Sequence, residues 1–251
     1  MAAAIAIVST VQPSQLVPFP TASKLGDRAA LMCSSPLFTG LSMAECEKIA
    51  AHARPRSFAP DELLFMQGDL ARNLFLIRSG SVKISQLSQN GNEVILWMRG
   101  AGNVVGLLSE PASSRHTSSA RVMEHCTALA WDYETVQSMV EEYPQIGRNM
   151  NQILASRLGE LEERFREVAT EKVPKRLALT LLRLRKNIGK EVRGGVEVSL
   201  SREELALMTG TTMFTISRIL SQWSREKFVS SHRQSVLVRD PQRLELVGDE
   251  I

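Results

Sequence analysis

The stretch SREELALMTGTTMFTISRIL, residues 201–220, decides how the carboxy-terminal part of this 251-residue chain folds. Ser201 followed by Glu204 is the residue pair of a capping box, which predicts that a helix begins here. Gly210 supplies a turn, and one of the two threonines that follow it caps a second helix. Apolar residues recur along this second helix at the spacing of one buried face: Ile216, Ile219, Leu220 and Trp223. The stretch therefore predicts a helix-turn-helix.

Positive charge is concentrated around this motif. Residues 172–251 hold 15 Lys and Arg against 9 Asp and Glu, a net charge of +6, whereas residues 1–171 hold 15 against 18, a net charge of −3. Two short apolar runs, KFVSS and SVLVRD, follow the motif and predict a hairpin with His232 and Arg233 at its tip. A basic helix-turn-helix with an adjacent hairpin is typical of DNA-binding domains. The alternative is a helical pair in an ordinary core beneath a solvated basic surface.

If the motif binds DNA, the second helix lies in the major groove and presents its amino-terminal residues to the base edges. Arg218 can donate two hydrogen bonds to guanine, whereas Thr212 and Thr215 suit phosphate oxygens. Met213 and Phe214 carry no donor, so they either contact thymine methyl groups or fill the core. The candidate reading residues are Thr212, Met213, Phe214, Thr215, Ser217 and Arg218.

Upstream, the pattern changes to that of strands. Short apolar or alternating runs lie between residues 62 and 132 and are separated by Gly68, Gly80, the Asn90–Gly91 pair and Gly100, which predicts hairpins in a sandwich or barrel. A Ser-rich loop at 102–122 interrupts them, and a helical pattern with a Ser42–Glu45 capping box precedes them at 31–51.

A long helix is predicted from 143 to 169. A narrow apolar seam flanked by charges runs along it, which favours a coiled-coil dimer; packing on its own domain is the alternative. The seam consists of Tyr143, Ile146, Met150, Leu154, Leu158, Leu161, Phe165 and Val168. Pro174 follows where the charge balance changes, so we expect a hinge at 170–174.

Several classes of protein are excluded by composition. Three widely spaced cysteines, Cys33, Cys46 and Cys126, give neither a disulfide framework nor a four-thiolate iron–sulfur site. Four scattered histidines give no metal or hydrolytic motif, so we expect no catalytic and no metal-binding residues. No apolar run is long enough to cross a membrane. We therefore expect a soluble cytoplasmic protein that does not bind membranes and is not an enzyme.

These motifs together resemble the Crp/Fnr family of bacterial transcription regulators. The resemblance covers residues 36–245 and rests on GDLARNLFLIRSGSVKIS, GAGNVVG and LMTGTTMFTISRILSQW, which occur in the family's order. It implies an α+β chain with an N-terminal β jelly-roll similar to a cyclic-nucleotide-binding domain, a long dimerisation helix, and a C-terminal winged helix-turn-helix. Double-stranded DNA and a second copy of the chain are the implied partners, and RNA polymerase is the further partner that an activator would need.

The implied boundaries divide the chain into four segments. A flexible extension covers 1–30, an effector domain covers 31–142, the dimerisation helix covers 143–171, and the DNA-binding domain covers 172–245.

The DNA-contacting positions match the family unevenly. The resemblance places Arg218 on the family's guanine-reading arginine, and it adds Arg202 and His232 as contacts to the DNA backbone. Phe214 stands where the family frequently has a base-reading glutamate, so we expect a half-site that keeps the guanine but differs beside it.

The effector loop departs further from the family. Cyclic-nucleotide binders use a Gly-Glu pair for the ribose and an Arg-Ser pair for the phosphate, whereas this chain has Gly106-Leu107 and Arg115-His116-Thr117-Ser118. Leucine cannot accept the ribose hydrogen bond, which argues against cyclic AMP. The candidate pocket residues are Gly106, Leu107, Arg115, His116 and Ser118.

Other effectors and functions stay open at this point. Haem held by His116, His125 or Cys126, and a redox role for Cys33 or Cys46, are alternatives, although we predict no cofactor. The favoured function is a sequence-specific, homodimeric DNA-binding transcription regulator on a palindromic site. The alternatives are a cyclic-nucleotide-responsive or other small-ligand module acting on a protein partner, and a jelly-roll enzyme.

Overall fold

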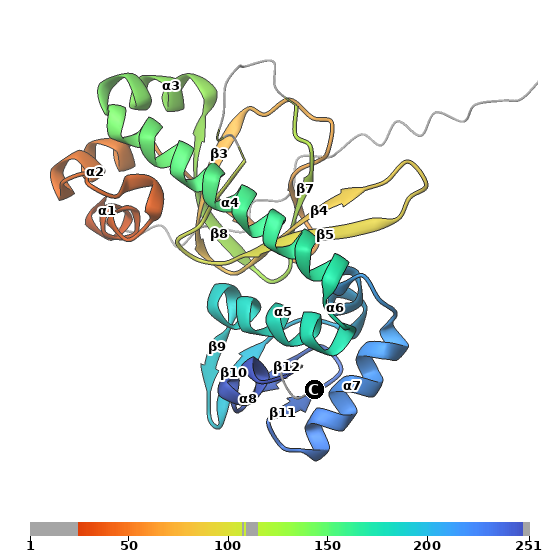
Figure 1. Cartoon of the computed structure of the whole chain (residues 1–251). Helices are drawn as coiled ribbons and strands as arrows, with labels where there is room; N and C mark the ends of the chain where they lie inside the picture. Colours follow the sequence, from red (N-terminus) through yellow and green to blue (C-terminus); the bar gives the residue numbers. More distant parts are fainter. Residues whose placement is uncertain (1–24, 107, 109–114, 248–251) are drawn as a thin grey trace, which may run out of the picture.

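The amino-terminal half of the chain folds into two antiparallel sheets packed face to face (Figure 1). We describe residues 25–106, 108 and 115–247 of a computed structural model. One sheet has the order β1-β8-β3-β6 and the other the order β2-β7-β4-β5. The strands are β1 (Arg54–Phe58), β2 (Leu63–Phe65), β3 (Asn73–Ser79), β4 (Val82–Leu87), β5 (Glu93–Arg99), β6 (Val104–Gly106), β7 (Ser119–Val122) and β8 (Cys126–Asp132). The predicted jelly-roll is confirmed.

Apolar residues that face inward on both sheets fill the space between them. Phe58 and Phe75 meet edge to face with their ring centroids 6.0 Å apart, and Ile77 and Val82 are fully buried beside them. The period of two that predicted strands thus corresponds to alternate residues lying in this core.

Helices cover the outer face of the β1-β8-β3-β6 sheet. They are α1 (Leu25–Cys33), α2 (Met43–Ala51), α3 (Tyr133–Glu142) and the first turns of α4 (Pro144–Thr170). Trp131 of β8 is buried among them and donates its indole N–H to the carbonyl oxygen of Ile49 at 3.2 Å. The predicted Ser42–Glu45 capping box is present at the start of α2.

The helical pattern at 31–51 is not one helix. Helix α1 ends at Cys33, a short 3-10 turn occupies Pro36–Phe38, and Gly40 has a positive φ of 88° before α2 begins. Helix α1 also begins at Leu25, so its first residues fall in the segment that the sequence assigned to the extension, and Ala29 among them is buried. The rest of that segment, residues 1–24, lies outside the described part of the chain.

The carboxy-terminal part is a small mixed domain. It contains α5 (Val173–Ile188), β9 (Lys190–Val192), β10 (Gly195–Val198), α6 (Arg202–Thr209), α7 (Met213–Arg225), β11 (Val229–Ser231), β12 (Val236–Val238) and α8 (Pro241–Glu245). Strands β11 and β12 pair as the predicted hairpin in a sheet of order β11-β12-β10-β9. The predicted winged helix-turn-helix is confirmed.

Two residues of the jelly-roll belong to the core of this second domain. Ile95 and Met98 of β5 are buried in the same cluster as Leu177, Leu205 and other residues of α5, α6 and α7. Figure 1 shows α5 and α6 lying directly below the β5 end of the roll. The two domains therefore share apolar packing in addition to the chain connection through α4.

Within the described residues, no helix is long and apolar enough to cross a membrane.

Candidate functional site

Local hydrogen bonds fix the helix-turn-helix as the sequence predicts. The Oγ of Ser201 accepts the backbone N–H of Glu204 at 3.2 Å, and the Glu204 carboxylate accepts the backbone N–H of Ser201 at 2.9 Å. Gly210 ends α6 with φ of 62°, a left-handed conformation that glycine adopts without strain. Thr212 caps α7 by accepting the backbone N–H of Thr215 at 3.3 Å. The turn is therefore fixed at both helix ends.

Helix α7 buries one face and presents the other, which carries both polar and apolar side chains, to solvent. Its apolar face is buried by the predicted residues, Ile216, Ile219, Leu220 and Trp223. Phe214 is 81% exposed, so it does not fill the core of this chain, and Met213 is 45% exposed. Arg218 is exposed, and among the described residues no hydrogen-bond or ion-pair partner holds it. Thr212 is also exposed, whereas Thr215 and Ser217 are half-buried.

Arg202 joins α6 to the hairpin beside it. Its Nη2 donates to the Oγ of Ser231 at 3.2 Å. His232 is exposed, and its backbone N–H donates to the carbonyl oxygen of Ser235 at 2.8 Å, which closes the turn between β11 and β12. The predicted contact residues thus lie on α7, at the start of α6 and at the tip of one hairpin, all in the same domain.

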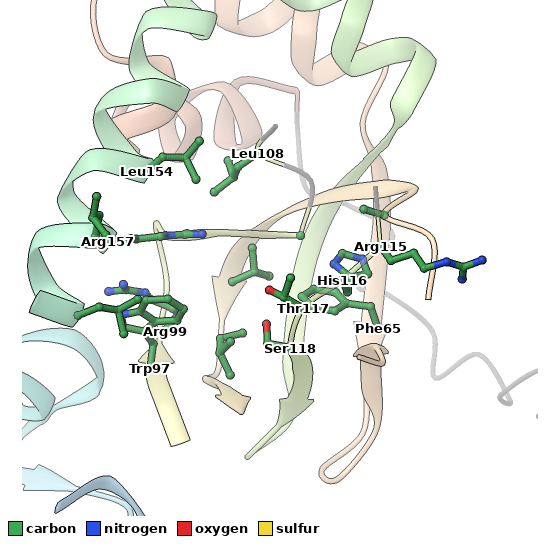
Figure 2. A pocket seen from close by; sticks show the side chains of 16 residues that line it. Phe65, Trp97, Arg99, Leu108, Arg115, His116, Thr117, Ser118, Leu154 and Arg157 are labelled. Carbon is green, nitrogen blue, oxygen red and sulfur yellow. The ribbon is translucent and has the colours of Figure 1, made fainter. Parts of the chain in front are cut away.

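A second candidate site is a cavity of about 360 Å³ between the jelly-roll and α4 (Figure 2). Four predicted pocket residues line it: Gly106, Arg115, His116 and Ser118. Gly106 has φ of 97°, and a Cβ there would lie 2.3 Å from the carbonyl oxygen of Asn73, so no side chain fits. Leu107, the fifth predicted residue, lies outside the described residues.

Two of these residues have positions that limit their roles. The His116 ring stacks on Phe65 with centroids 3.7 Å apart, and burial lowers the pKa of His116, so the ring is neutral at pH 7. Arg115 donates to the carbonyl oxygen of Gly68 at 2.7 Å, and in Figure 2 its guanidinium points away from α4. The arginine that the sequence offered for an anion is thus tied to the backbone at the far edge of the cavity.

Further residues of this cavity, among them three with large polar or aromatic side chains, were not predicted from the sequence. Trp97 and Arg99 of β5 and Arg157 of α4 line its other side, as Figure 2 shows. Arg99 forms an ion pair of 2.9 Å with Glu160, and Arg157 donates to the carbonyl oxygen of Val104 at 2.5 Å. In the sequence, Arg157 has the position of a charge that flanks a coiled-coil seam. Its place in the cavity depends on the packing of α4 against the roll, which the sequence pattern does not show.

The apolar seam of α4 divides into two parts. Ile146 and Met150 are buried in the core of their own domain, so the prediction that these two residues belong to a dimer seam is wrong. The reason is that the first turns of α4 pack on the 3-10 turn and α3. Further along, side chains at heptad spacing are partly or largely exposed: Leu154, Leu158, Leu161, Phe165 and Val168.

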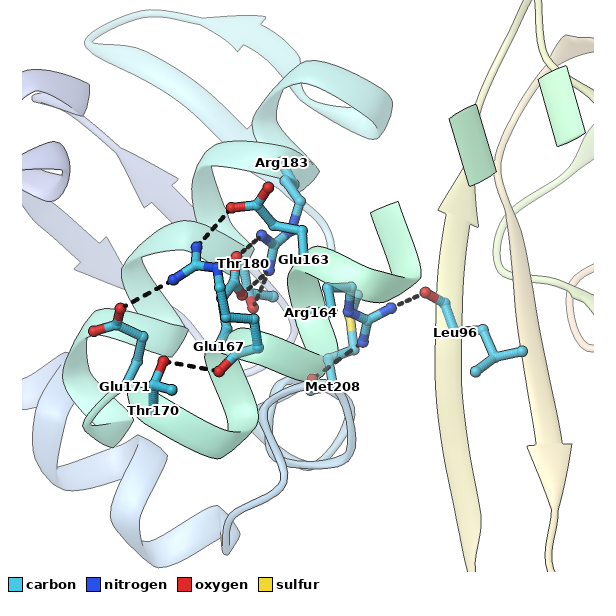
Figure 3. A network of polar contacts seen from close by, with 10 residues as sticks. Leu96, Glu163, Arg164, Glu167, Thr170, Glu171, Thr180, Arg183 and Met208 are labelled. Carbon is cyan, nitrogen blue, oxygen red and sulfur yellow. Dashed lines mark hydrogen bonds and ion pairs between the residues drawn. The ribbon is translucent and has the colours of Figure 1, made fainter. Parts of the chain in front are cut away.

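Polar contacts tie the end of α4 to both domains (Figure 3). Arg164 donates to the carbonyl oxygens of Leu96 and Ile95 in β5 and, at 3.2 Å, to that of Met208 in α6. One turn on, the Glu167 carboxylate accepts two hydrogen bonds from Arg183 of α5, at 2.5 and 2.8 Å. Helix α4 therefore contacts the roll and the helix-turn-helix through the same side chain.

Two of the cysteines lie together. The Sγ atoms of Cys33 and Cys46 are 3.2 Å apart, with Cys33 exposed and Cys46 buried. Burial and the neighbouring Cys33 raise the pKa of Cys46 to about 12, and burial raises that of Cys126 to about 12. Within the described residues, no group of His, Cys, Asp and Glu could hold a metal ion. Of the haem candidates, His125 makes a 3.1 Å hydrogen bond with Ser57.

The raised pKa values of Cys46 and Cys126 predict which cysteine reacts fastest with a thiol reagent. At pH 8 a thiol with a pKa of about 12 is ionised to only about one part in ten thousand, and the thiolate is the nucleophile. We expect one fast reaction per native chain with an aromatic disulfide reagent, at Cys33, and three after denaturation. The absorbance of the released thiolate measures both. A Cys33→Ser variant that keeps the fast phase would contradict this assignment.

Comparisons with known proteins agree with this geometry. Residues 55–143 match the family model "Cyclic nucleotide-binding domain", and residues 175–247 match "Crp-like helix-turn-helix domain". The chain is 26% identical over 216 residues to a CRP-like cAMP-activated global transcriptional regulator of Mycobacterium tuberculosis, covering 85% of this chain and 96% of the relative. It is 29% identical over 218 residues to the cyclic AMP receptor protein of Thermus thermophilus, covering 86% and 98%.

A solved structure has the same fold. FixK2 from Bradyrhizobium japonicum superposes with a TM-score of 0.68 at 23% identity, over 77% of this chain and 96% of that one. The two family models match in this order, on either side of a long helix. The relatives that match along most of their length are transcription regulators. The chain belongs to the Crp/Fnr family of DNA-binding transcription regulators.

Proposed function

We propose that the protein reads a specific DNA sequence as a homodimer on a two-fold symmetric site, with the amino terminus of α7 in the major groove. The observation that carries this proposal is the exposed Arg218, which no other described residue engages, on a helix whose opposite face is anchored in the core. Exposed Thr212 and His232 lie in the same domain and suit phosphate oxygens.

The exposed part of the α4 seam supports dimerisation. Side chains at 154, 158, 161, 165 and 168 repeat at steps of four and three, which is the spacing of a two-stranded coiled coil. Phe165 is 78% exposed in the single chain. A second α4 packed against this seam would remove these apolar side chains from water.

Phe165→Asp is expected to weaken the dimer by at least about tenfold, because it places a charge in the middle of the apolar seam. Sedimentation velocity over a concentration series measures the dissociation constant. Glu162 is an exposed residue of the same helix that lies outside the seam. Glu162→Gln should therefore sediment like the parent. A Phe165→Asp protein that remains dimeric at the same concentrations would show that the dimer uses another surface.

The effector differs from a cyclic nucleotide in our proposal. Leucine at 107 replaces the acceptor for the ribose, and Arg115 is bound to the carbonyl oxygen of Gly68. A ligand in the cavity contacts the roll and α4 together, and Arg164 links α4 to α6. Ligand binding would thus shift the population between arrangements of the two α7 helices.

Selection from random duplex DNA tests the function. We expect the purified protein to enrich a palindrome with a guanine in each half-site, and to lose affinity steeply with salt because phosphate contacts release counterions. A folded dimer that enriches no sequence, with or without added small molecules, would overturn the proposal in favour of a module acting on a protein partner.

A further inference from the structure

Cys33 and Cys46 form a thiol pair at the contact between α1 and α2. Their Sγ atoms are 3.2 Å apart, although the two residues are 13 positions apart in the sequence. Cys33 is the last residue of α1 and is exposed, whereas Cys46 lies in α2 with its side chain buried. A reagent in solution therefore reaches the sulfur of Cys33 directly, and the sulfur of Cys46 lies in contact with it.

A disulfide bond between these two sulfurs requires little movement. Because such a bond is about 2 Å long, the sulfurs have to approach each other by about 1 Å. Cys46 is held within α2 by the hydrogen bond from its backbone N–H to the carbonyl oxygen of Ser42 at 3.0 Å. Cys33 lies at the end of its helix, next to the exposed Ser34, so the approach can be made by its side chain.

The surroundings give the two thiols different roles. Burial, the neighbouring Cys33 and the negative charge of Glu45 raise the pKa of Cys46 to about 12, so Cys46 does not react first. The Glu45 carboxylate accepts hydrogen bonds from the backbone N–H and the hydroxyl of Ser42, both at 2.7 Å, so it is already engaged. Cys33 is therefore the attacking thiol, and Cys46 is the thiol that resolves the oxidised form of Cys33.

We propose that Cys33 and Cys46 form an intramolecular disulfide when the protein meets a hydroperoxide. The sulfur of Cys33 attacks one peroxide oxygen and breaks the O–O bond, which leaves Cys33 as a sulfenic acid and releases water or an alcohol. The sulfur of Cys46 then attacks the sulfur of Cys33 and breaks its S–O bond. The departing hydroxide takes the thiol proton of Cys46 and leaves as water.

This reaction balances with a single oxidant molecule. Both thiols are oxidised to one disulfide, and one peroxide is reduced. The new bond links α1 to α2, the helices that cover the outer face of the β1-β8-β3-β6 sheet. The chemistry does not depend on the proposed function, because no DNA takes part in it.

Oxidation of the full-length, reduced protein with a small excess of hydrogen peroxide tests the proposal. Free thiols counted after denaturation should fall from three to one in the parent, and dithiothreitol should restore them. Cleavage after Arg28 and Lys48 releases both cysteines in one peptide, residues 29–48, which mass spectrometry should find lighter by two hydrogen atoms. Because this peptide comes from the parent, the result does not depend on the folding of a variant.

Two cysteine variants provide matched controls. Cys33→Ser changes an exposed position and should keep both of its remaining thiols under the same treatment. Cys126 is buried in the core of the roll, away from the pair, so Cys126→Ala should lose both of its thiols.

The kinetics with an aromatic disulfide reagent give an independent readout. The fast reaction at Cys33 leaves a mixed disulfide, and attack by Cys46 then releases a second thiolate in a slower step. Because this step is intramolecular, its rate should not depend on reagent concentration and should exceed that of Cys126 modification by about tenfold or more. Cys46→Ala should show the fast release without the second one.

Several outcomes would overturn the proposal. They are three free thiols in the peroxide-treated parent, a sulfenic or sulfinic acid at Cys33 as the final product, a disulfide between two chains on a non-reducing gel, or a second release whose rate rises with reagent concentration. Since no DNA is present in these experiments, any of these results leaves the outcome of the DNA selection unaffected, and the reverse also holds.

Discussion

Replacing Arg183 by methionine is expected to lower the free energy of unfolding by about 3 kcal/mol. The side chain of Glu167 is 4% exposed, and its carboxylate accepts both hydrogen bonds of a bidentate pair from Arg183. Methionine fills similar space but leaves this buried carboxylate without its cation, which is the costly way to break such a pair. Urea unfolding followed by circular dichroism measures the change.

An exposed arginine on α4 provides the matched comparison. Arg166 pairs with Glu163 at 2.8 Å, and both side chains are more than half exposed. Because water already solvates both charges, Arg166→Met should cost less than about 1 kcal/mol. Equal losses from Arg183→Met and Arg166→Met would mean that the Glu167 pair contributes no more than a surface ion pair.

Arg218→Ala is expected to reduce discrimination at one base pair of each half-site by about 1 to 3 kcal/mol, or roughly five- to 150-fold. Arg218 is exposed on the amino-terminal half of α7, and its guanidinium can donate two parallel hydrogen bonds to guanine. The measurement compares the affinity of parent and variant for the selected palindrome and for the same duplex with that guanine replaced in both halves.

Arg225 lies in the last turn of the same helix and serves as the control. It is exposed but lies more than two turns from the amino-terminal residues, so Arg225→Ala should weaken all sequences equally or not at all. If Arg218→Ala keeps the full preference for guanine, the assignment of Arg218 as a base-reading residue is wrong.

The helix-turn-helix could be predicted because its determinants are local. Each cap or turn joins residues that are at most four positions apart in the sequence. The capping box of Ser201 and Glu204, the turn at Gly210 and the cap at Thr212 all form as the sequence indicates. The exposure of Phe214 could not be predicted, because an aromatic residue at that helical position fits either a core or a surface.

The cavity could be predicted only in part, because its residues are distant in sequence. Gly106, Arg115, His116 and Ser118 lie within 13 positions of one another in the sequence, and a family pattern points to them. Arg99 and Arg157 are brought together by the packing of α4 on the roll, which periodicity does not reveal. For the same reason the buried start of the α4 seam could not be distinguished from its exposed end.

The placement of Ile95 and Met98 affects how the protein unfolds on heating and whether its domains can be separated. Both residues belong to the roll, but their side chains are buried in the core built by α5, α6 and α7. An excised fragment beginning at α5 would lack them, leaving its own apolar residues open to water and prone to aggregate. In the intact chain the two domains should melt in one calorimetric transition, and exchanging either domain with that of a relative requires exchanging these two strand positions with it.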